Sequence, residues 1–194
     1  MATFFQNTSI NYDKVTVTAD GINTEEFLAA SESLVKIFDL FGSVFGVVQK
    51  DMTGNIEKIR ARYNEKPAIS STLQNLVKGE MAEKKKVATD GLLWLTRGLD
   101  FTLQSLERSE NHPEEELSVS FTKGYEATLS KHHTFLIRPV FSMAMKACPY
   151  RNDFYAKLGQ DQGLVKQDLS AYLNGLRTIV ADIQQFYKDN KLDK

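Results

Sequence analysis

The 194-residue sequence has a single cysteine, Cys148, and an almost even balance of charge. One cysteine cannot form an intramolecular disulfide or supply the thiolates of a cysteine-built metal site. The 24 Lys and Arg residues stand against 25 Asp and Glu residues, which gives a net charge of −1. The broad basic surface of a nucleic-acid-binding protein is therefore not expected. We predict no metal, no other cofactor and no nucleic-acid partner.

Long apolar runs are also missing. No segment approaches the roughly 18–20 apolar residues that span a bilayer. The first residues, MATFFQNTSINYDK, lack the basic and apolar regions of a secretory signal. Hydrophobic residues nevertheless make up 42% of the chain, which is ordinary for a globular domain. We predict a soluble, cytoplasmic protein in a reducing compartment.

Prolines are scarce, and Val15–Ala19 is the one segment with the alternation of a short strand. Elsewhere apolar residues repeat at helical spacing, starting from a capping-box-like pair, Asn23 and Glu26. The predicted helices span about 23–41, 44–63, a short segment around 73–77, 83–106, 115–131, 133–147, 151–158 and 164–188. These patterns predict an all-α protein, with an N-terminal segment over 1–22 and one all-helical domain over 23–194.

The predicted helix over 44–63 carries a polar stripe beside its apolar stripe. Asp51, Asn55, Lys58 and Arg62 follow the spacing i, i+4, i+7, i+11, so they share one side of the helix. The stripe fits a solvated face with weak side-chain pairs, each contributing about 0.2–0.5 kcal/mol. It also fits a pocket mouth, where a carboxylate, an amide and an ammonium satisfy the hydroxyls of a sugar ring. A phosphate would favour several cations and no carboxylate.

Four motifs, in order along the chain, resemble those of the glycolipid transfer protein family. They are Asp51-x-x-x-Asn55-x-x-Lys58, Leu93-Trp94-Leu95-x-Arg97-Gly98-Leu99-Asp100-Phe101, His132-His133-x-Phe135 and Ala147-Cys148-Pro149-Tyr150-Arg151-x-Asp153-Phe154. The resemblance extends from about Asn23 to Phe186. It implies a two-layer helical sandwich of about eight helices, with a surface headgroup site that opens into an apolar tunnel. It also implies a monomeric carrier that moves one sphingolipid at a time between membranes and catalyses no reaction.

The resemblance also implies roles for individual side chains. The headgroup and ceramide amide would be held by Asp51, Asn55, Lys58, Trp94 and His133. An indole face is a platform for a sugar, and its N–H can donate a hydrogen bond. In the family the histidine bonds the ceramide carbonyl and the aspartate accepts the amide N–H. From the residues alone, Trp94 also fits a core tryptophan and His133 a structural hydrogen-bonding group. The adjacent His132 is expected to point elsewhere.

Lipid chains and membrane contact would use apolar residues. The predicted tunnel residues are Phe38, Leu92, Leu136, Phe141, Leu173, Ile179 and Phe186, each of which also fits an ordinary core. For transient membrane docking, Phe135 matches a family position that carries an interfacial aromatic residue. An aromatic and basic segment adds Tyr150, Arg151 and Lys157 to the predicted docking residues. A peripheral location at membrane surfaces follows.

Several alternatives stay open. Asn55 and Trp94 stand where ceramide-1-phosphate carriers place cations, which favours neutral glycosylceramides over ceramide-1-phosphate. A sensor or adaptor would bind the same lipid and report its occupancy to a partner. An enzyme would need more than Asp51 and His133, because retaining glycosidases use two carboxylates and no nucleophile motif is present. The polar end, Lys191–Lys194, departs from the aromatic or apolar ends of many family members.

Overall fold

The computed structural model describes residues 2–193, most of which are helical. The α-helices are α1 (Thr24–Val35), α2 (Gly46–Glu65), α3 (Leu73–Ala82), α4 (Val87–Asn111), α5 (Leu117–Ala127), α6 (Arg138–Lys146), α7 (Arg151–Leu158) and α8 (Gln162–Asp189). The strands described are β1 (Val17–Thr18) and β2 (Gly21–Ile22), which pair as an antiparallel hairpin. The all-α prediction is confirmed for these residues. No helix among them is long and apolar enough to cross a membrane.

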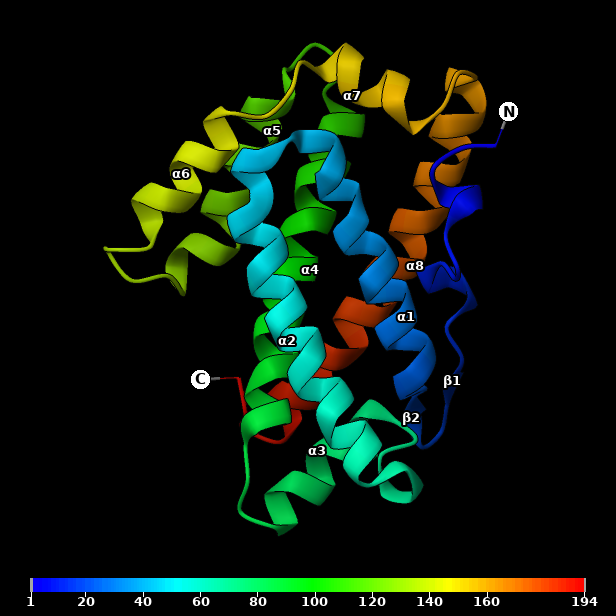
Figure 1. The fold of residues 1–194 in the computed structure, drawn as a ribbon, viewed down its shortest axis with the longest axis vertical. Helices are drawn as coiled ribbons and strands as arrows, with labels where there is room; N and C mark the ends of the chain where they lie inside the picture. The colour runs from blue at the N-terminus through cyan, green and yellow to red at the C-terminus, as the bar shows by residue number, and fades with distance from the viewer. Residues whose placement is uncertain (1, 194) are drawn as a thin grey trace.

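The helices form two layers around α4. Helices α1 and α2 lie in front of α4 and α8, while α6 and α7 cover the upper end of the molecule (Figure 1). Helix α4 packs against α2, α3, α5 and α8. The largest side chains of the continuous core are aromatic and fully buried, including Phe27, Phe38, Phe101 and Phe121. Helix α4 contains many apolar residues because it lies at the centre of the molecule and buries side chains against neighbouring helices on several sides.

Several helix boundaries differ from the sequence prediction, and three of these differences have a clear local cause. The first helix ends at Val35 and continues as a 3-10 helix over Lys36–Phe41. Helix α4 begins at Val87 rather than near residue 83, because the backbone turns through a positive φ of 58° at Lys84. Helix α6 begins at Arg138 rather than 133, since Pro139 lacks an amide hydrogen and therefore fits the first helical turn.

The N-terminal segment packs directly on α8. A Cβ atom at Gly175 would lie only 2.3 Å from the backbone nitrogen of Asp13, so only glycine permits this approach. Phe5 and Tyr12 are buried there, with ring centroids 5.0 Å and 5.7 Å from that of Tyr172. The segment thus contributes to the common core. The boundary after residue 22 remains a prediction.

Glu80, near the end of α3, holds the beginning of α4. Its buried carboxylate accepts hydrogen bonds from the backbone nitrogens of Ala88 (3.0 Å) and Thr89 (2.7 Å) and from the Thr89 hydroxyl (2.8 Å). These amides belong to the first turn of α4, where no intrahelical acceptor is present and a negative charge is favourable. Glu80 therefore caps the helix that carries Trp94.

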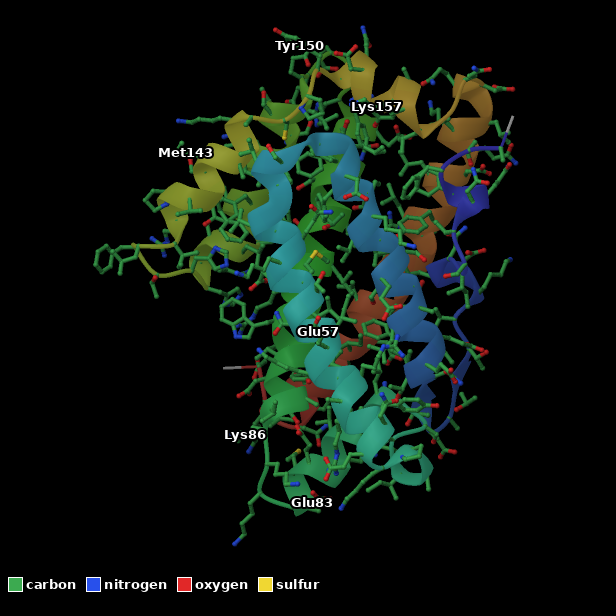
Figure 2. All side chains as sticks on the ribbon, in the orientation of Figure 1. Glu57, Glu83, Lys86, Met143, Tyr150 and Lys157 are labelled. Carbon is green, nitrogen blue, oxygen red and sulfur yellow. The ribbon has the colours of Figure 1, made fainter. Side chains whose placement is uncertain are left out.

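We expect Glu80→Ala to lower the free energy of unfolding by about 2–4 kcal/mol, because three buried donors lose their acceptor. Urea denaturation followed by circular dichroism measures the change. Glu57→Ala is the matched control, since Glu57 is exposed on α2 (Figure 2) and should change stability by less than about 0.5 kcal/mol. Equal stability of the two variants would contradict a capping role for Glu80.

Candidate functional site

Two glycines of α4 allow α2 to approach closely. A Cβ atom at Gly91 would lie 3.1 Å from the Cβ of Lys58 and 3.3 Å from the carbonyl oxygen of Asn55. Gly98 also lies against α2. Gly91 and Gly98 are seven residues apart on one side of α4, and Trp94 lies between them along the helix. The crossing therefore brings Trp94 to the part of α2 that carries the polar stripe.

The polar stripe is partly connected by its own hydrogen bonds. The Asn55 side chain is buried, donates to the Asp51 carbonyl oxygen (3.0 Å) and accepts from the Lys58 ammonium (3.0 Å). Asp51 is exposed, and no hydrogen bond to its carboxylate is formed within residues 2–193. Desolvation by the surrounding protein raises the pKa of Asp51, and the charge of Lys58 opposes that rise. The carboxylate is thus a partly desolvated acceptor that is open to a ligand.

His133 lies next to Trp94. The two ring planes are inclined by 17°, with centroids 6.0 Å apart, and the Phe141 centroid is 4.4 Å from that of His133. His133 is buried, and its Nδ1 is 3.1 Å from the Tyr125 hydroxyl. Burial and the charge of Arg138 lower the pKa of His133, so the ring is neutral at neutral pH. With Nδ1 engaged, Nε2 is the nitrogen available to a ligand.

Sequence reasoning missed two neighbours of Trp94. The Arg97 guanidinium lies over the indole at 4.8 Å from its centroid, and the His132 ring meets it edge-on at 6.4 Å. His132, which was expected to point elsewhere, thus lies near the edge of the indole and also lines a separate cavity. Arg97 was detectable in principle, because residues at i and i+3 of a helix are neighbours. His132 was not, because its position depends on the chain path after α5.

The predicted tunnel residues do not share one environment. Five of them are buried in the continuous core: Phe38, Leu92, Phe141, Leu173 and Ile179. Phe186 is only partly buried, with the Lys78 ammonium 6.0 Å from its ring centroid. Leu136 is 68% exposed, which contradicts its assignment to an interior tunnel. The reason is that residues 134–137 precede α6 in a turn and do not form its buried face.

The beginning of α6 instead presents an exposed apolar surface. Phe135 is 79% exposed, and Met143 and Tyr150 lie at the outer edge of the molecule (Figure 2). We define the α6 apolar face as Phe135, Leu136, Ile137, Val140 and Met143, all of which are exposed. An exposed cluster of large apolar side chains marks a surface that contacts a protein or a membrane. The predicted docking residue Phe135 belongs to this face, whereas Tyr150 is exposed at the beginning of α7.

The two predicted docking cations lie in different surroundings. The Arg151 guanidinium donates to the carbonyl oxygen of Ser109 at 2.6 Å and lies 4.4 Å from the Tyr155 ring centroid. This half-buried, hydrogen-bonded position makes Arg151 less available for the membrane docking predicted for it. Lys157 is exposed, but its ammonium donates to the Leu40 carbonyl oxygen at 3.3 Å. Both cations therefore join α7 to neighbouring segments.

A group of potential metal ligands lies away from Trp94, at the end of α4. Ligand atoms of His112, Glu114 and Glu115 all lie within 4.8 Å of one another. Glu115, however, already accepts a hydrogen bond from the Arg108 Nε at 2.9 Å. A cation of the protein thus already neutralises this group, which is better explained as an ion-pair cluster.

The chain is similar to proteins of one family. The family model described as "Glycolipid transfer protein (GLTP)" matches residues 22–160. A glycolipid transfer protein of Aureobasidium melanogenum is 50% identical over 95% of this chain and 92% of its own length. The human pleckstrin homology domain-containing family A member 8 is 32% identical over 98% of this chain. This chain spans only about 40% of the length of that relative.

Solved structures agree with the sequence comparison. The fungal glycolipid transfer protein HET-C2 is 46% identical, with a TM-score of 0.91 over 96% of this chain and 97% of its own. The GLTP fold of FAPP2, described as selecting simple glycosphingolipids, is 31% identical, with a TM-score of 0.91 over 99% of this chain and 98% of its own. Mouse ceramide-1-phosphate transfer protein is 20% identical, with a TM-score of 0.86 over 96% of this chain and 99% of its own, and so shows only that the fold is shared.

Proposed function

Because this chain belongs to the glycolipid transfer protein family, we propose that it binds a glycosphingolipid and carries it between membranes without altering it chemically. The observation that carries the proposal is the close crossing of α2 and α4, where Gly91, one turn before Trp94, meets Asn55 and Lys58. An aromatic platform next to an acceptor, an amide and a donor suits a sugar ring, which has apolar C–H faces and hydroxyls that both donate and accept.

The same site suits the amide of a ceramide. Asp51 would accept the amide N–H, and the Nε2 of His133 would face the ceramide carbonyl or a neighbouring hydroxyl. A buried amide left without partners costs about 1–3 kcal/mol, so this pair of contacts favours ceramide over lipids that have only ester linkages. The lipid chains would enter the apolar core, gaining roughly 0.8 kcal/mol per methylene removed from water.

The proposed headgroup site is less suited to a phosphate. Its polar stripe offers the Lys58 ammonium together with the carboxylate of Asp51, because the other cation of the stripe, Arg62, is buried and paired with Glu83. A phosphate requires several donors and is repelled by a carboxylate. Neutral glycosylceramides are therefore the ligands we expect, with ceramide-1-phosphate as a much weaker ligand.

Transfer between vesicles tests the proposal directly. Donor vesicles would contain fluorescent glucosylceramide, ceramide-1-phosphate or phosphatidylcholine, and acceptor vesicles would contain none of them. We expect rapid transfer of glucosylceramide and recovery of that lipid unchanged by mass spectrometry. Tight binding without transfer would instead indicate a lipid sensor, and recovery of a cleaved lipid would indicate an enzyme.

We propose that the α6 apolar face inserts transiently into the membrane surface during loading and release. Phe135→Ala should lower partitioning to phosphatidylcholine vesicles about tenfold, because a large exposed ring no longer enters the interface. Vesicle sedimentation measures the partitioning. Val87→Ala is the matched control, because Val87 is 63% exposed at the opposite end of the molecule. Equal partitioning of the two variants would place membrane contact elsewhere.

A further inference from the structure

A cavity of about 290 Å³ lies between α4, α8, residues 128–132 and the C-terminal residues. Arg97 and His132 are part of its lining. Much of its lining is apolar, and Leu93, Ile183 and Tyr187 contribute to it. None of the five predicted headgroup residues lines the cavity. It is therefore separate from the site proposed for the sugar, although Arg97 and His132 contact both the cavity and Trp94.

Positive charge surrounds the cavity. Arg97, Lys131 and Lys188 line it together with His132. Within residues 2–193, none of these four side chains has a carboxylate oxygen within 4.0 Å, whereas other cations such as Arg108 and Arg177 form close ion pairs. The cations around the cavity are thus available to an anion.

Two carboxylates, those of Asp100 and Asp193, also line the cavity. They differ in how far they can neutralise the surrounding cations. Asp100 accepts hydrogen bonds from the side-chain amides of Gln104 (2.9 Å) and Gln184 (3.2 Å). Asp193 is exposed near the end of the chain, where its backbone oxygen accepts from Arg97 at 3.4 Å. The Asp193 carboxylate is therefore the principal competitor for an anion in the cavity.

Arg97 connects the cavity to Trp94. Its side chain is half-buried, so the guanidinium is incompletely hydrated, and this desolvation lowers the pKa of Arg97. The same guanidinium lies over the indole ring of Trp94. An anion beside Arg97 would replace part of the missing hydration and would change the electrostatic surroundings of the indole.

We propose that this cavity binds a small anionic amphiphile. Its charged head would lie near Arg97, Lys131 and Lys188, and its short apolar chain would lie against Leu93, Ile183 and Tyr187. A volume of about 290 Å³ holds roughly ten non-hydrogen atoms, taking about 30 Å³ for each water-sized unit. A medium-chain carboxylate such as octanoate has that size and chemistry. This inference does not depend on glycolipid transfer, because it rests on a different set of side chains.

Trp94 is the single tryptophan of the chain, so its fluorescence reports binding next to it. We expect octanoate, kept below its micelle concentration, to produce a saturable fluorescence change. Octyltrimethylammonium has the same chain length and the opposite charge, and it should produce none. Equal responses to the two amphiphiles would overturn the proposal, because binding would then depend on the apolar chain alone.

Variants locate the bound amphiphile. The double variant Lys131→Gln/Lys188→Gln should weaken octanoate binding about tenfold, whereas Asp193→Asn should strengthen it about threefold. Lys166→Gln is the matched control, because Lys166 is an exposed lysine of α8 outside this cavity, and it should leave the affinity unchanged. Unchanged affinity in the double variant would place octanoate elsewhere in the protein and overturn the proposal.

The two proposals can fail separately. Asp51→Val alters the proposed headgroup site but no residue of the cavity, so it should leave the octanoate affinity unchanged. If Asp51→Val keeps full glycolipid transfer, the headgroup proposal fails while the cavity proposal stands. If Asp51→Val abolishes octanoate binding, the amphiphile occupies the headgroup site, and the cavity proposal fails.

Discussion

Trp94→Ala is expected to slow glucosylceramide transfer at least about thirtyfold. The substitution removes the sugar platform and the indole N–H, and a stacking contact with one hydrogen bond amounts to roughly 2–3 kcal/mol. It also removes the ring beside His133, so the imidazole loses a contact that holds its orientation. The measurement is the initial rate of intervesicular transfer at equal protein concentration.

A second substitution at this position separates the contribution of the aromatic face from that of the indole N–H. Trp94→Phe retains an aromatic face and lacks the donor, so we expect its transfer rate to fall between those of the wild type and Trp94→Ala. Far-UV circular dichroism should be the same for all three proteins, because Trp94 is only half-buried. If Trp94→Ala transferred glucosylceramide at the wild-type rate, the proposed headgroup site would be misplaced.

Asp51→Val should have an even larger effect on transfer. The carboxylate is open to a ligand, and a hydrogen bond to a charged acceptor contributes about 1.5–3 kcal/mol. Loss of two such bonds predicts a reduction of at least about a hundredfold in glucosylceramide transfer. Glu57→Val is the matched control, since Glu57 is exposed on the same helix outside the polar stripe, and it should transfer normally.

The stability of Asp51→Val distinguishes a binding residue from a structural one. The pKa of Asp51 is raised in the folded protein, so the folded state binds this proton more tightly than the unfolded state does. Ionised Asp51 therefore makes the fold less stable as the pH rises through its folded pKa. Removing the carboxylate should leave the unfolding free energy at pH 7 unchanged or slightly higher. A clear loss of stability would mean that Asp51 serves the fold.

Much of the helical fold could be predicted because helix periodicity is a local property. The apolar repeat located α2, α4, α7 and α8 to within a few residues of at least one end. It failed where the backbone departs from an α-helix for reasons outside the repeat. Residues 36–41 and 134–137 carry apolar side chains at suitable spacing, yet the first is a 3-10 helix and the second a turn before Pro139.

The sequence by itself determined that Asp51, Asn55 and Lys58 share one side of a helix, because side-chain direction within a helix follows from residue number. Only the tertiary structure decided which residues of other helices lie next to that side. The close crossing at Gly91 brings Trp94 to it, and the turn after α5 brings His132 and His133 to Trp94. The same turn exposes Leu136, which the apolar pattern had placed inside. Such neighbours depend on the crossing of separate helices and on the path of the loops, and neither is encoded in the spacing of residues along one helix.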